Sequence, residues 1–344
     1  MHIERRILEE LDSPYAVGVF NLGGEKRAVV ASEEKDLCLA FSKDGKRLET
    51  IWENQGGTMN LCQTDEEGNF LAVQEFYKGF RSHTAGIARA WKEDGRWNVK
   101  RYIDLPFVHR FCVQKVEDRQ FVIACTLSDR KDSPQDWSRP GRVYLGLLPR
   151  DLSEPCEIKE LIGGITKNHG LFQGRFQGKA VVLVTGQEGV FRIDVPQKVS
   201  DEWHWERIID REVSDVTAVD IDGDGQDELI TIEGFHGNTI ALNKLVGGEW
   251  KIVSRYPVAT AHALWSGDVL GKPGVLVGYR GANAGLLLMR YNGEKKLGNL
   301  LLETTVLDQY EGPVNLGVIA EPNDFRIFNV SGTNNRFVYY RLTP

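Results

Sequence analysis

The sequence predicts an all-β protein, a single seven-bladed β-propeller that takes up residues 1–344 and whose last blade is closed by the N-terminal strand. Three observations lead to this fold class. One two-strand pattern recurs seven times, its copies begin 45 to 60 residues apart, and 36 glycines suit a fold with many tight turns. No convincing long helix or linker interrupts the period, so we expect one closed ring.

Each copy of the pattern predicts a β-hairpin, in which a polar turn joins two short apolar strands. The copies open at Tyr15, Asn60, His109, His169, Thr217, His262 and Asn315, so the blades are predicted to start near residues 13, 58, 107, 167, 215, 260 and 313. A second, outer hairpin is visible at 37–53, 85–103, 239–256 and 285–306. The spacing is close to the roughly 40 to 50 residues of one four-stranded blade.

The last blade lacks a strand. After Asn315 only 29 residues remain, enough for three strands but not for a fourth. Residues 2–10 lie outside the repeat and read as a strand. We expect them to complete the last blade, because a closed ring leaves no sheet edge exposed.

Composition restricts the partners. A net charge of −7 argues against nucleic acid, since phosphate binding needs a basic face. No run approaches the roughly 18 apolar residues of a membrane span, and the N-terminus has no apolar signal-peptide core. Five cysteines without paired spacing fit free thiols in a reducing compartment. We therefore expect a cytoplasmic protein with no membrane or nucleic-acid partner.

The turn of the fifth copy, DIDGDGQDE, predicts a calcium loop. Its oxygen donors fall at alternate positions: Asp220, Asp222, Asp224, Gln226 and Glu228. Such a loop places several oxygens around a hard cation, as Ca²⁺ requires. An EF-hand is excluded because its twelfth position is Thr231 rather than Glu and both flanks are strands. A calcium-free turn held by Asp hydrogen bonds is the alternative.

The opening position of the copies predicts a metal site. Innermost strands of a propeller start at one face, so equivalent residues point into one central funnel. Three of the seven histidines of the chain, His109, His169 and His262, open copies of the pattern. Three converging imidazoles suit a divalent transition metal, Zn²⁺, Mn²⁺, Fe²⁺ or Ni²⁺. The alternative is that each histidine bonds neighbouring backbone and fills the channel.

The loops between the second and third strands should form the wall of the funnel, and they are rich in aromatic, cationic and amide side chains. The expected catalytic residues are His236, first choice as base, with Lys131, Tyr77 and Glu233 as rivals, and Arg280 for an oxyanion or carboxylate. The expected substrate-binding residues are Asn60, Asn315, Trp137, Glu233, Tyr279 and Asn335. Aromatic rings beside cations and amides suit a small saccharide.

These parts predict a lyase. A bound metal would polarise a carbonyl or carboxylate while a base removes the adjacent proton, and loss of a β-leaving group would complete the elimination. Without that loss, the same site would isomerise or epimerise its substrate.

Resemblances favour the same chemistry. The loop at Asp220 is similar to the DxDxDG calcium loop of FG-GAP/VCBS propeller repeats, and the chain resembles the propeller of aldos-2-ulose dehydratase. The expected His-lined channel is reminiscent of oligogalacturonate lyases. The segments that carry these resemblances are PFVHRF around His109, CTLSDRKDSPQDWSRPG after it, EGFHGN around His236 and TAHALWSGD around His262. The last resemblance implies dependence on Mn²⁺. The implied substrate is a ketosugar, a 3-keto-glycoside or a uronate.

Two other classes of protein fit the same sequence. A non-catalytic propeller would bind a glycan or a protein through the same rim, with structural histidines. A glycosidase would need two opposed carboxylates, for which Glu188, Asp132 and Glu233 are available.

Overall fold

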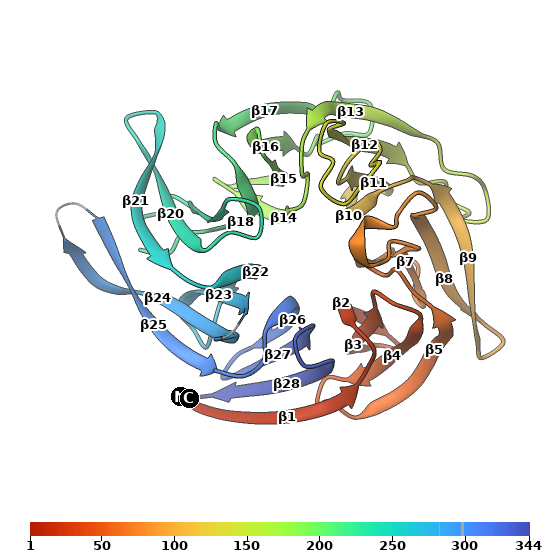
Figure 1. Ribbon diagram of the computed structural model, residues 1–344, viewed down its shortest axis with the longest axis horizontal. Helices are drawn as coiled ribbons and strands as arrows, with labels where there is room; N and C mark the ends of the chain where they lie inside the picture. The colour runs from red at the N-terminus through yellow and green to blue at the C-terminus, as the bar shows by residue number, and fades with distance from the viewer. Residues whose placement is uncertain (282, 297–298) are drawn as a thin grey trace.

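The computed structural model describes residues 1–281, 283–296 and 299–344. These residues form seven four-stranded antiparallel sheets arranged around a central axis (Figure 1). The predicted all-β fold and its seven blades are confirmed. The helical content of the described residues is one 3-10 turn, η1 (Lys78–Phe80), in the loop between the second and third strands of blade two.

The first four blades follow the chain in order, innermost strand first. Blade one holds β2 (Pro14–Leu22), β3 (Glu25–Ser32), β4 (Asp36–Ser42) and β5 (Arg47–Gln55). Blade two holds β6 (Leu61–Gln63), β7 (Asn69–Gln74), β8 (Gly86–Glu93) and β9 (Arg96–Asp104). Blade three holds β10 (Val108–Val116), β11 (Arg119–Thr126), β12 (Gly141–Leu147) and β13 (Ile158–Ile165). Blade four holds β14 (Leu171–Phe176), β15 (Lys179–Gly186), β16 (Gly189–Asp194) and β17 (His204–Ile209).

The last three blades complete the ring. Blade five holds β18 (Val213–Val219), β19 (Glu228–Glu233), β20 (Thr239–Val246) and β21 (Glu249–Pro257). Blade six holds β22 (Thr260–Asp268), β23 (Pro273–Arg280), β24 (Gly285–Lys296) and β25 (Asn299–Asp308). Blade seven holds β26 (Pro313–Glu321), β27 (Asp324–Ser331), β28 (Arg336–Thr343) and, as its outer strand, β1 (His2–Glu10).

The N-terminal strand closes the ring, as predicted. β1 pairs antiparallel with β28 from His2 opposite Thr343 to Glu10 opposite Arg336, and the two ends of the chain lie side by side (Figure 1). Arg5 of β1 also contacts the neighbouring blade six, where its Nε lies 2.7 Å from Oδ2 of Asp308 at the end of β25. Because one strand of blade seven comes from the N-terminal end of the chain and three come from the C-terminal end, this pairing holds the ring together.

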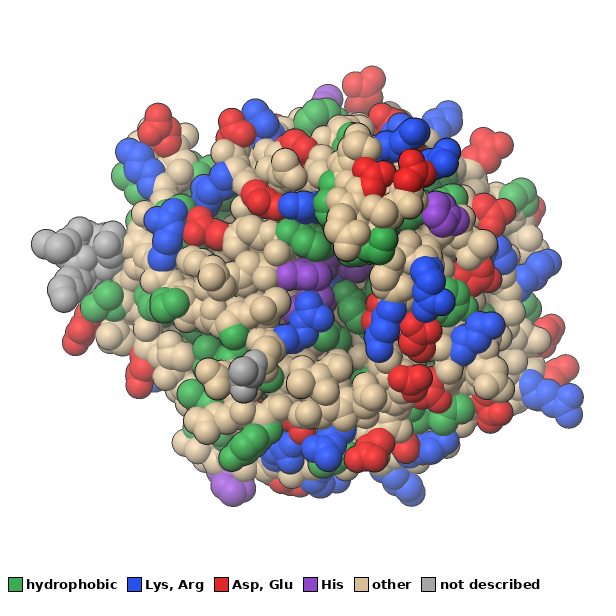
Figure 2. All heavy atoms as spheres, viewed as in Figure 1, with side chains coloured by type: hydrophobic (Ala, Val, Ile, Leu, Met, Phe, Trp, Pro, Cys, Tyr) green, Lys and Arg blue, Asp and Glu red, His purple; other side chains and the backbone are tan. Residues whose placement is uncertain are grey.

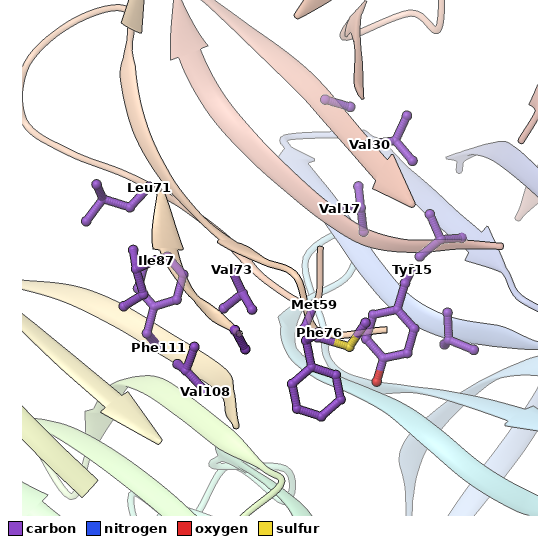
Figure 3. Close-up of a cluster of buried hydrophobic side chains, with 14 of the residues drawn as sticks. Tyr15, Val17, Val30, Met59, Leu71, Val73, Phe76, Ile87, Val108 and Phe111 are labelled. Carbon is purple, nitrogen blue, oxygen red and sulfur yellow. The ribbon is translucent and has the colours of Figure 1, made fainter. Parts of the chain in front are cut away.

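The core lies between neighbouring blades, and successive residues of a strand face the blade on one side and then the blade on the other. Figure 3 shows part of one such cluster, to which Val17 and Val30 of blade one and Leu71 and Val73 of blade two belong. Aliphatic side chains of this kind are fully or almost fully buried along every innermost hairpin. Their burial explains the repeated apolar strands, because a sheet covered on both faces needs apolar residues at consecutive positions.

Bulges set the direction of the residues nearest the axis. In five blades the pairing of the two innermost strands shifts register near the start of the innermost strand, so that this strand carries one extra residue. The extra residues are Tyr15, His109, Ser214, His262 and Val314. A bulge inserts one residue without changing the apolar pattern around it, so the sequence does not locate it. The assumed equivalence of the seven openings is therefore wrong for Thr217 and Asn315, which follow the bulged residues Ser214 and Val314.

Two further observations bear on the earlier expectations. All five cysteines are free. No helix in the described part of the chain is long and apolar enough to cross a membrane.

A candidate metal and substrate site in the central channel

Four histidines meet at the centre of one face of the ring. His109 and His262 are the bulged residues of β10 and β22, and His169 directly precedes Gly170 at the start of blade four. His236 comes from the loop between β19 and β20, where its φ of 50° turns the chain sharply. Figure 2 shows histidine side chains in a hollow at the middle of this face, with Lys or Arg side chains beside them.

Three of these imidazoles are close enough to hold one ion. The ligand atoms of His169, His236 and His262 all lie within 4.8 Å of one another. The predicted metal set contained His109 in place of His236, so the structure brings together two predicted ligands and the predicted base. His109 remains adjacent, with its ring centroid 4.8 Å from that of His169.

Two of the rings have a tautomer fixed by the backbone. His169 Nδ1 lies 3.2 Å from the carbonyl oxygen of Ser214. His262 Nδ1 lies 2.8 Å from the carbonyl oxygen of Val314. A carbonyl only accepts hydrogen bonds, so both rings carry their proton on Nδ1 and leave the lone pair of Nε2 available. Backbone carbonyls orient metal-binding histidines in the same way.

His236 adopts the opposite tautomer. Its Nε2 lies 3.3 Å from Nε2 of His169, which is an acceptor, so His236 donates from Nε2. Its Nδ1 can then accept from the Arg280 guanidinium, 3.5 Å away. To bind a metal through Nε2, His236 would have to move its proton to Nδ1 and would no longer accept from Arg280.

The hydroxyl of Tyr15 links His109 to His262. Its oxygen lies 3.3 Å from Nε2 of His262 and 3.4 Å from Nε2 of His109. Because Nε2 of His262 carries a lone pair, the hydroxyl donates to His262 and accepts from His109. Burial raises the pKa of Tyr15 to about 12, so the hydroxyl keeps its proton at neutral pH.

Burial keeps all four histidines neutral. It lowers the pKa of His109, His169 and His262 well below the usual value, and neighbouring charges add to the effect. Burial and then the charge of Arg280 lower the pKa of His236 to about 3. Neutral imidazoles are the form that binds metals, so the donor set fits a divalent transition metal.

A pocket of about 130 Å³ lies against the histidines, and Glu33 and Arg280 are its charged wall residues. The Glu33 carboxyl has no hydrogen bond or ion pair with any residue that the structure describes. Burial raises the pKa of Glu33 to about 7, although the nearby charge of Lys78 opposes the shift. A carboxyl group with such a pKa in a pocket is suited to proton transfer.

Glu33 is not among the site residues expected from the sequence. Its segment, SEEKD, joins β3 to β4 in blade one, the same position in the blade as the loops of the other blades that were expected to form the funnel wall. The signal was therefore present in the repeat itself. Which of the two consecutive glutamates faces the pocket depends on the turn, and Glu34 instead pairs with Arg81 at 3.0 Å.

An aromatic wall stands beside the histidines. Trp137 lies between Phe80 and Phe235, with both pairs of ring centroids 5.3 Å apart, and Phe235 stacks on His236 at 4.2 Å. Lys131 Nζ lies 3.2 Å from the centroid of the Trp137 ring and donates to the Asp136 carbonyl at 2.5 Å. Burial lowers the pKa of Lys131 to about 8.

A second pocket, of about 440 Å³, adjoins this wall. Tyr77 and Lys131 line it, and it shares Gly79 and Phe80 with the histidine pocket. Two of the five predicted catalytic residues, His236 and Arg280, therefore lie in the histidine pocket. Two others, Tyr77 and Lys131, lie in the pocket next to it, and Glu233 lines neither pocket.

Several predicted substrate-binding residues do not line the histidine pocket and contact other parts of the protein. Asn60 Oδ1 accepts from the Phe111 amide, and Asn335 Oδ1 accepts from the Ser13 amide. Glu233 pairs with two arginines, at 3.2 and 2.8 Å. The Tyr279 hydroxyl lies against Gly285, outside the histidine pocket. Asn315 lies in the channel, in a different pocket from the histidines.

The acidic loop of blade five also groups oxygens that could hold a metal. One carboxylate oxygen from each of Asp220, Asp222 and Asp224 lies within 4.8 Å of the others. Lys244 of β20, however, places Nζ among these acids, 3.0 Å from Asp222 Oδ2 and 2.8 Å from Asp224 Oδ2. Its Nζ also lies 2.5 Å from Glu228 Oε1. The predicted Ca²⁺ remains a prediction, and it would compete with this ammonium group.

The remaining predicted ligand, Gln226, donates its backbone amide to Asp224 Oδ1 at 3.0 Å. Asp220 accepts three backbone amides of the loop, from residues 223, 224 and 225. The loop is thus held by Asp hydrogen bonds, as in the calcium-free alternative.

Fold and site together define a class of protein, a seven-bladed β-propeller with a histidine-lined central pocket. No protein-family model matches the chain, and no curated protein is significantly similar to it in sequence. The resemblance to FG-GAP/VCBS repeats, aldos-2-ulose dehydratase and oligogalacturonate lyases therefore stays a prediction.

Solved structures match the fold over almost the whole chain. The β-propeller domain of Cps50 (Swd1) from Myceliophteria thermophila has a TM-score of 0.60 and 10% identity, covering 99% of this chain and 100% of that one. Virginiamycin B lyase from Staphylococcus aureus has a TM-score of 0.62 and 13% identity, with the same coverages. A Bacteroides uniformis protein named provisionally as a 6-phosphogluconolactonase has a TM-score of 0.56 and 12% identity, covering 96% and 99%. Identities this low support the fold alone.

Proposed function

We propose that the protein is a metal-dependent lyase or dehydratase that acts by β-elimination on a small ketosugar, 3-keto-glycoside or uronate. The observation that carries this proposal is the grouping of three neutral imidazoles within 4.8 Å beside a carboxyl and a guanidinium in one pocket. Among solved structures of the same fold, virginiamycin B lyase is named as a lyase. That likeness supports the fold as a scaffold for elimination and says nothing of the substrate.

His169, His236 and His262 would hold the metal, Mn²⁺, Zn²⁺, Fe²⁺ or Ni²⁺. When bound, it would polarise a carbonyl or carboxylate of the substrate and so acidify the neighbouring C–H group. The carbonyls of Ser214 and Val314 orient two of the three rings before any ligand arrives. This preorganisation reduces the cost of binding.

Glu33 is the base that we assign to the reaction. Its pKa of about 7 leaves an appreciable fraction of the carboxylate ionised at neutral pH, and no ion pair among the described residues holds it in place. His236, the base expected from the sequence, is poorly suited because its pKa is lowered to about 3. The proton that Glu33 removes from carbon can be returned to the leaving oxygen as its C–O bond breaks, which balances the elimination.

Arg280 is placed to bind negative charge. Its guanidinium is largely buried, and its one hydrogen bond to a described residue is the long contact with His236. A substrate carboxylate or a developing oxyanion in the pocket would give it a stronger partner. Arg280 would then orient the substrate with its acidic C–H toward Glu33.

An isomerase or epimerase remains the alternative at the same site, with Glu33 returning its proton to carbon. The glycosidase reading lacks support, because the residues that line the histidine pocket include a single carboxyl group, that of Glu33. A non-catalytic propeller that binds a glycan or a protein would hold no transition metal.

Metal analysis of untagged protein by plasma mass spectrometry tests the proposal first. We expect about one transition-metal ion per chain, lost in a His169→Ala/His262→Ala double variant and kept in His204→Gln, which alters an exposed histidine of β17. Metal-free wild type, or metal retained in the double variant, would refute the site. Both variants are checked for native-like circular dichroism.

Turnover then tests the assigned base. Candidate ketosugars and uronates are screened for the absorbance of the unsaturated product. Glu33→Gln should retain the metal and lose activity by about 100-fold or more, whereas Glu34→Gln should remain active. Equal loss in both variants, or full activity in Glu33→Gln, would contradict the role of Glu33.

A further inference from the structure

The central channel contains another pocket, which we call the Arg110 pocket. It is distinct from the histidine pocket and from the pocket of about 440 Å³ beside that one. The Arg110 pocket has a volume of about 260 Å³ and shares no lining residue with the histidine pocket. Its walls are segments of the innermost strands β10, β14, β18, β22 and β26. The polar residues that line it are Arg110, Gln173, Asp215, Thr217, Ser266 and Asn315.

The bulges explain why the two pockets differ. The bulged residues His109 and His262 line the histidine pocket, while the residues that follow them, Arg110 and Ala263, line the Arg110 pocket. Asp215 likewise directly follows a bulged residue. The same irregularity that directs imidazoles into one pocket thus places a cation and an acid in the next.

Arg110 is a half-buried cation in the wall of this pocket. Its Nε is buried without a hydrogen-bond acceptor, and the guanidinium forms no hydrogen bond or ion pair with any described residue. A guanidinium carries five N–H donors, and burying one of them, that of Nε, without an acceptor is costly. The group is therefore suited to a bidentate carboxylate ligand.

Asp215 presents the opposite charge to the same pocket. The residue is 9% exposed, and its Oδ1 accepts the backbone amide of Val216 at 2.9 Å. Its second oxygen bonds to no described residue. Arg110 and Asp215 do not form an ion pair with each other at 4.0 Å or less, although both line this space. Two opposite, unpaired charges around one cavity match a ligand that carries both charges.

The remaining polar groups are compatible with such a ligand. Ser266 Oγ donates to the Ala218 carbonyl, so the hydroxyl of Thr217, 2.6 Å from it, donates to Ser266. Both hydroxyl oxygens therefore have lone pairs left for an ammonium group. Asn315 uses Oδ1 for the Leu316 amide, which leaves its NH₂ group to donate to a carboxylate.

We propose that this pocket binds a small zwitterion, an α-amino acid, with its carboxylate on Arg110 and its ammonium group on Asp215. The site is separate from the proposed metal site and does not depend on the lyase assignment. The pocket has room for a short side chain, which would lie against Leu264 and Trp265.

Calorimetric titration of the metal-stripped wild-type protein tests the proposal with glycine and alanine as ligands and acetate and methylamine as controls. We expect one amino acid bound per chain, with acetate and methylamine each at least about tenfold weaker because each uses one of the two charges. Equal affinity for acetate and glycine, or no binding of either amino acid, would overturn the proposal.

Variants assign the two charges. Arg110→Gln and Asp215→Asn should each weaken amino-acid binding about tenfold or more, whereas Arg96→Gln, which alters an exposed arginine of β9, should leave it unchanged. Unchanged binding in either charge variant would refute the assignment. Because both residues are buried in part, each variant is first compared with the wild type by circular dichroism. The comparison of glycine with acetate uses the wild type alone and does not depend on how the variants fold. The His169→Ala/His262→Ala variant should still bind glycine, which separates this site from the metal site.

Discussion

Replacing Lys244 by glutamine should convert the acidic loop of blade five into a calcium-responsive site. The ammonium group of Lys244 lies where a cation would be held, with its shortest contact at 2.5 Å, to Glu228 Oε1. Burial opposes its charge, but hydrogen bonds to three carboxylates outweigh that effect and raise the pKa of Lys244. In Lys244→Gln the carboxylates would lose this compensating charge and repel one another.

The expected loss of stability follows from this geometry. Removing one partner of a buried ion pair costs about 3 to 5 kcal/mol, and partial exposure of Asp224, at 38%, favours the lower end, about 3 kcal/mol. For 344 residues, about 2.1 cal/mol/K per residue gives an unfolding entropy of about 0.7 kcal/mol/K. The variant should therefore melt about 4 °C below the wild type in EDTA.

Calcium should reverse most of this loss in the variant. At about 100 times its Kd, a bound ion contributes about 2.7 kcal/mol. In the wild type Ca²⁺ must displace the Lys244 ammonium, so its effect on Tm should be smaller. Melting curves with EDTA and with Ca²⁺ measure the difference, and Lys251→Gln, which removes an exposed lysine of the same blade, is the control. An equal calcium shift in wild type and Lys244→Gln, or none in the variant, would refute the reasoning.

The structure makes two further predictions about stability. Three buried histidines have pKa values well below the usual one, so at pH below about 6.5 the unfolded chain binds more protons than the folded chain, and the free energy of unfolding falls as pH falls. Each contributes about 1.4 kcal/mol per pH unit, whereas Glu33, with its raised pKa, has the opposite slope between 4.5 and about 7. Urea unfolding in EDTA at pH 7.5 and 5.5 should show that the free energy of unfolding changes less with pH in His262→Asn than in the wild type. An equal change in both proteins would contradict the lowered pKa of His262. Deleting residues 1–10 should expose the edge of β28 and remove the contacts of Arg5 with buried Asp308 and Glu311. The truncated protein should melt lower and scatter light increasingly with concentration, and an unaltered Tm would show that β1 does not hold the ring closed.

The periodic part of the fold was readable from the sequence because propeller blades repeat the same local pattern. Seven apolar hairpins predicted seven blades, and the shortage of strands after Asn315 predicted closure by residues 2–10, which the structure places at β1. Even the three histidines that open copies of the pattern do meet at the axis. Each of these inferences depends on alternation and spacing alone, which the sequence contains in full.

Tertiary structure decided which side chains face which pocket. A β-bulge moves a residue by one position without any mark in the apolar pattern, so Asn315 was assigned to the ring of histidines and lies in the other pocket. The approach of His236 to His169 depends on a loop with positive φ, and the position of Glu33 depends on a turn between two consecutive glutamates. The motif of the acidic loop likewise gave no sign that a lysine from the next strand reaches its centre. The sequence by itself determined the ring and its residue types, whereas contacts between strands far apart in the chain determined the charges, tautomers and partners that the chemistry of the site requires.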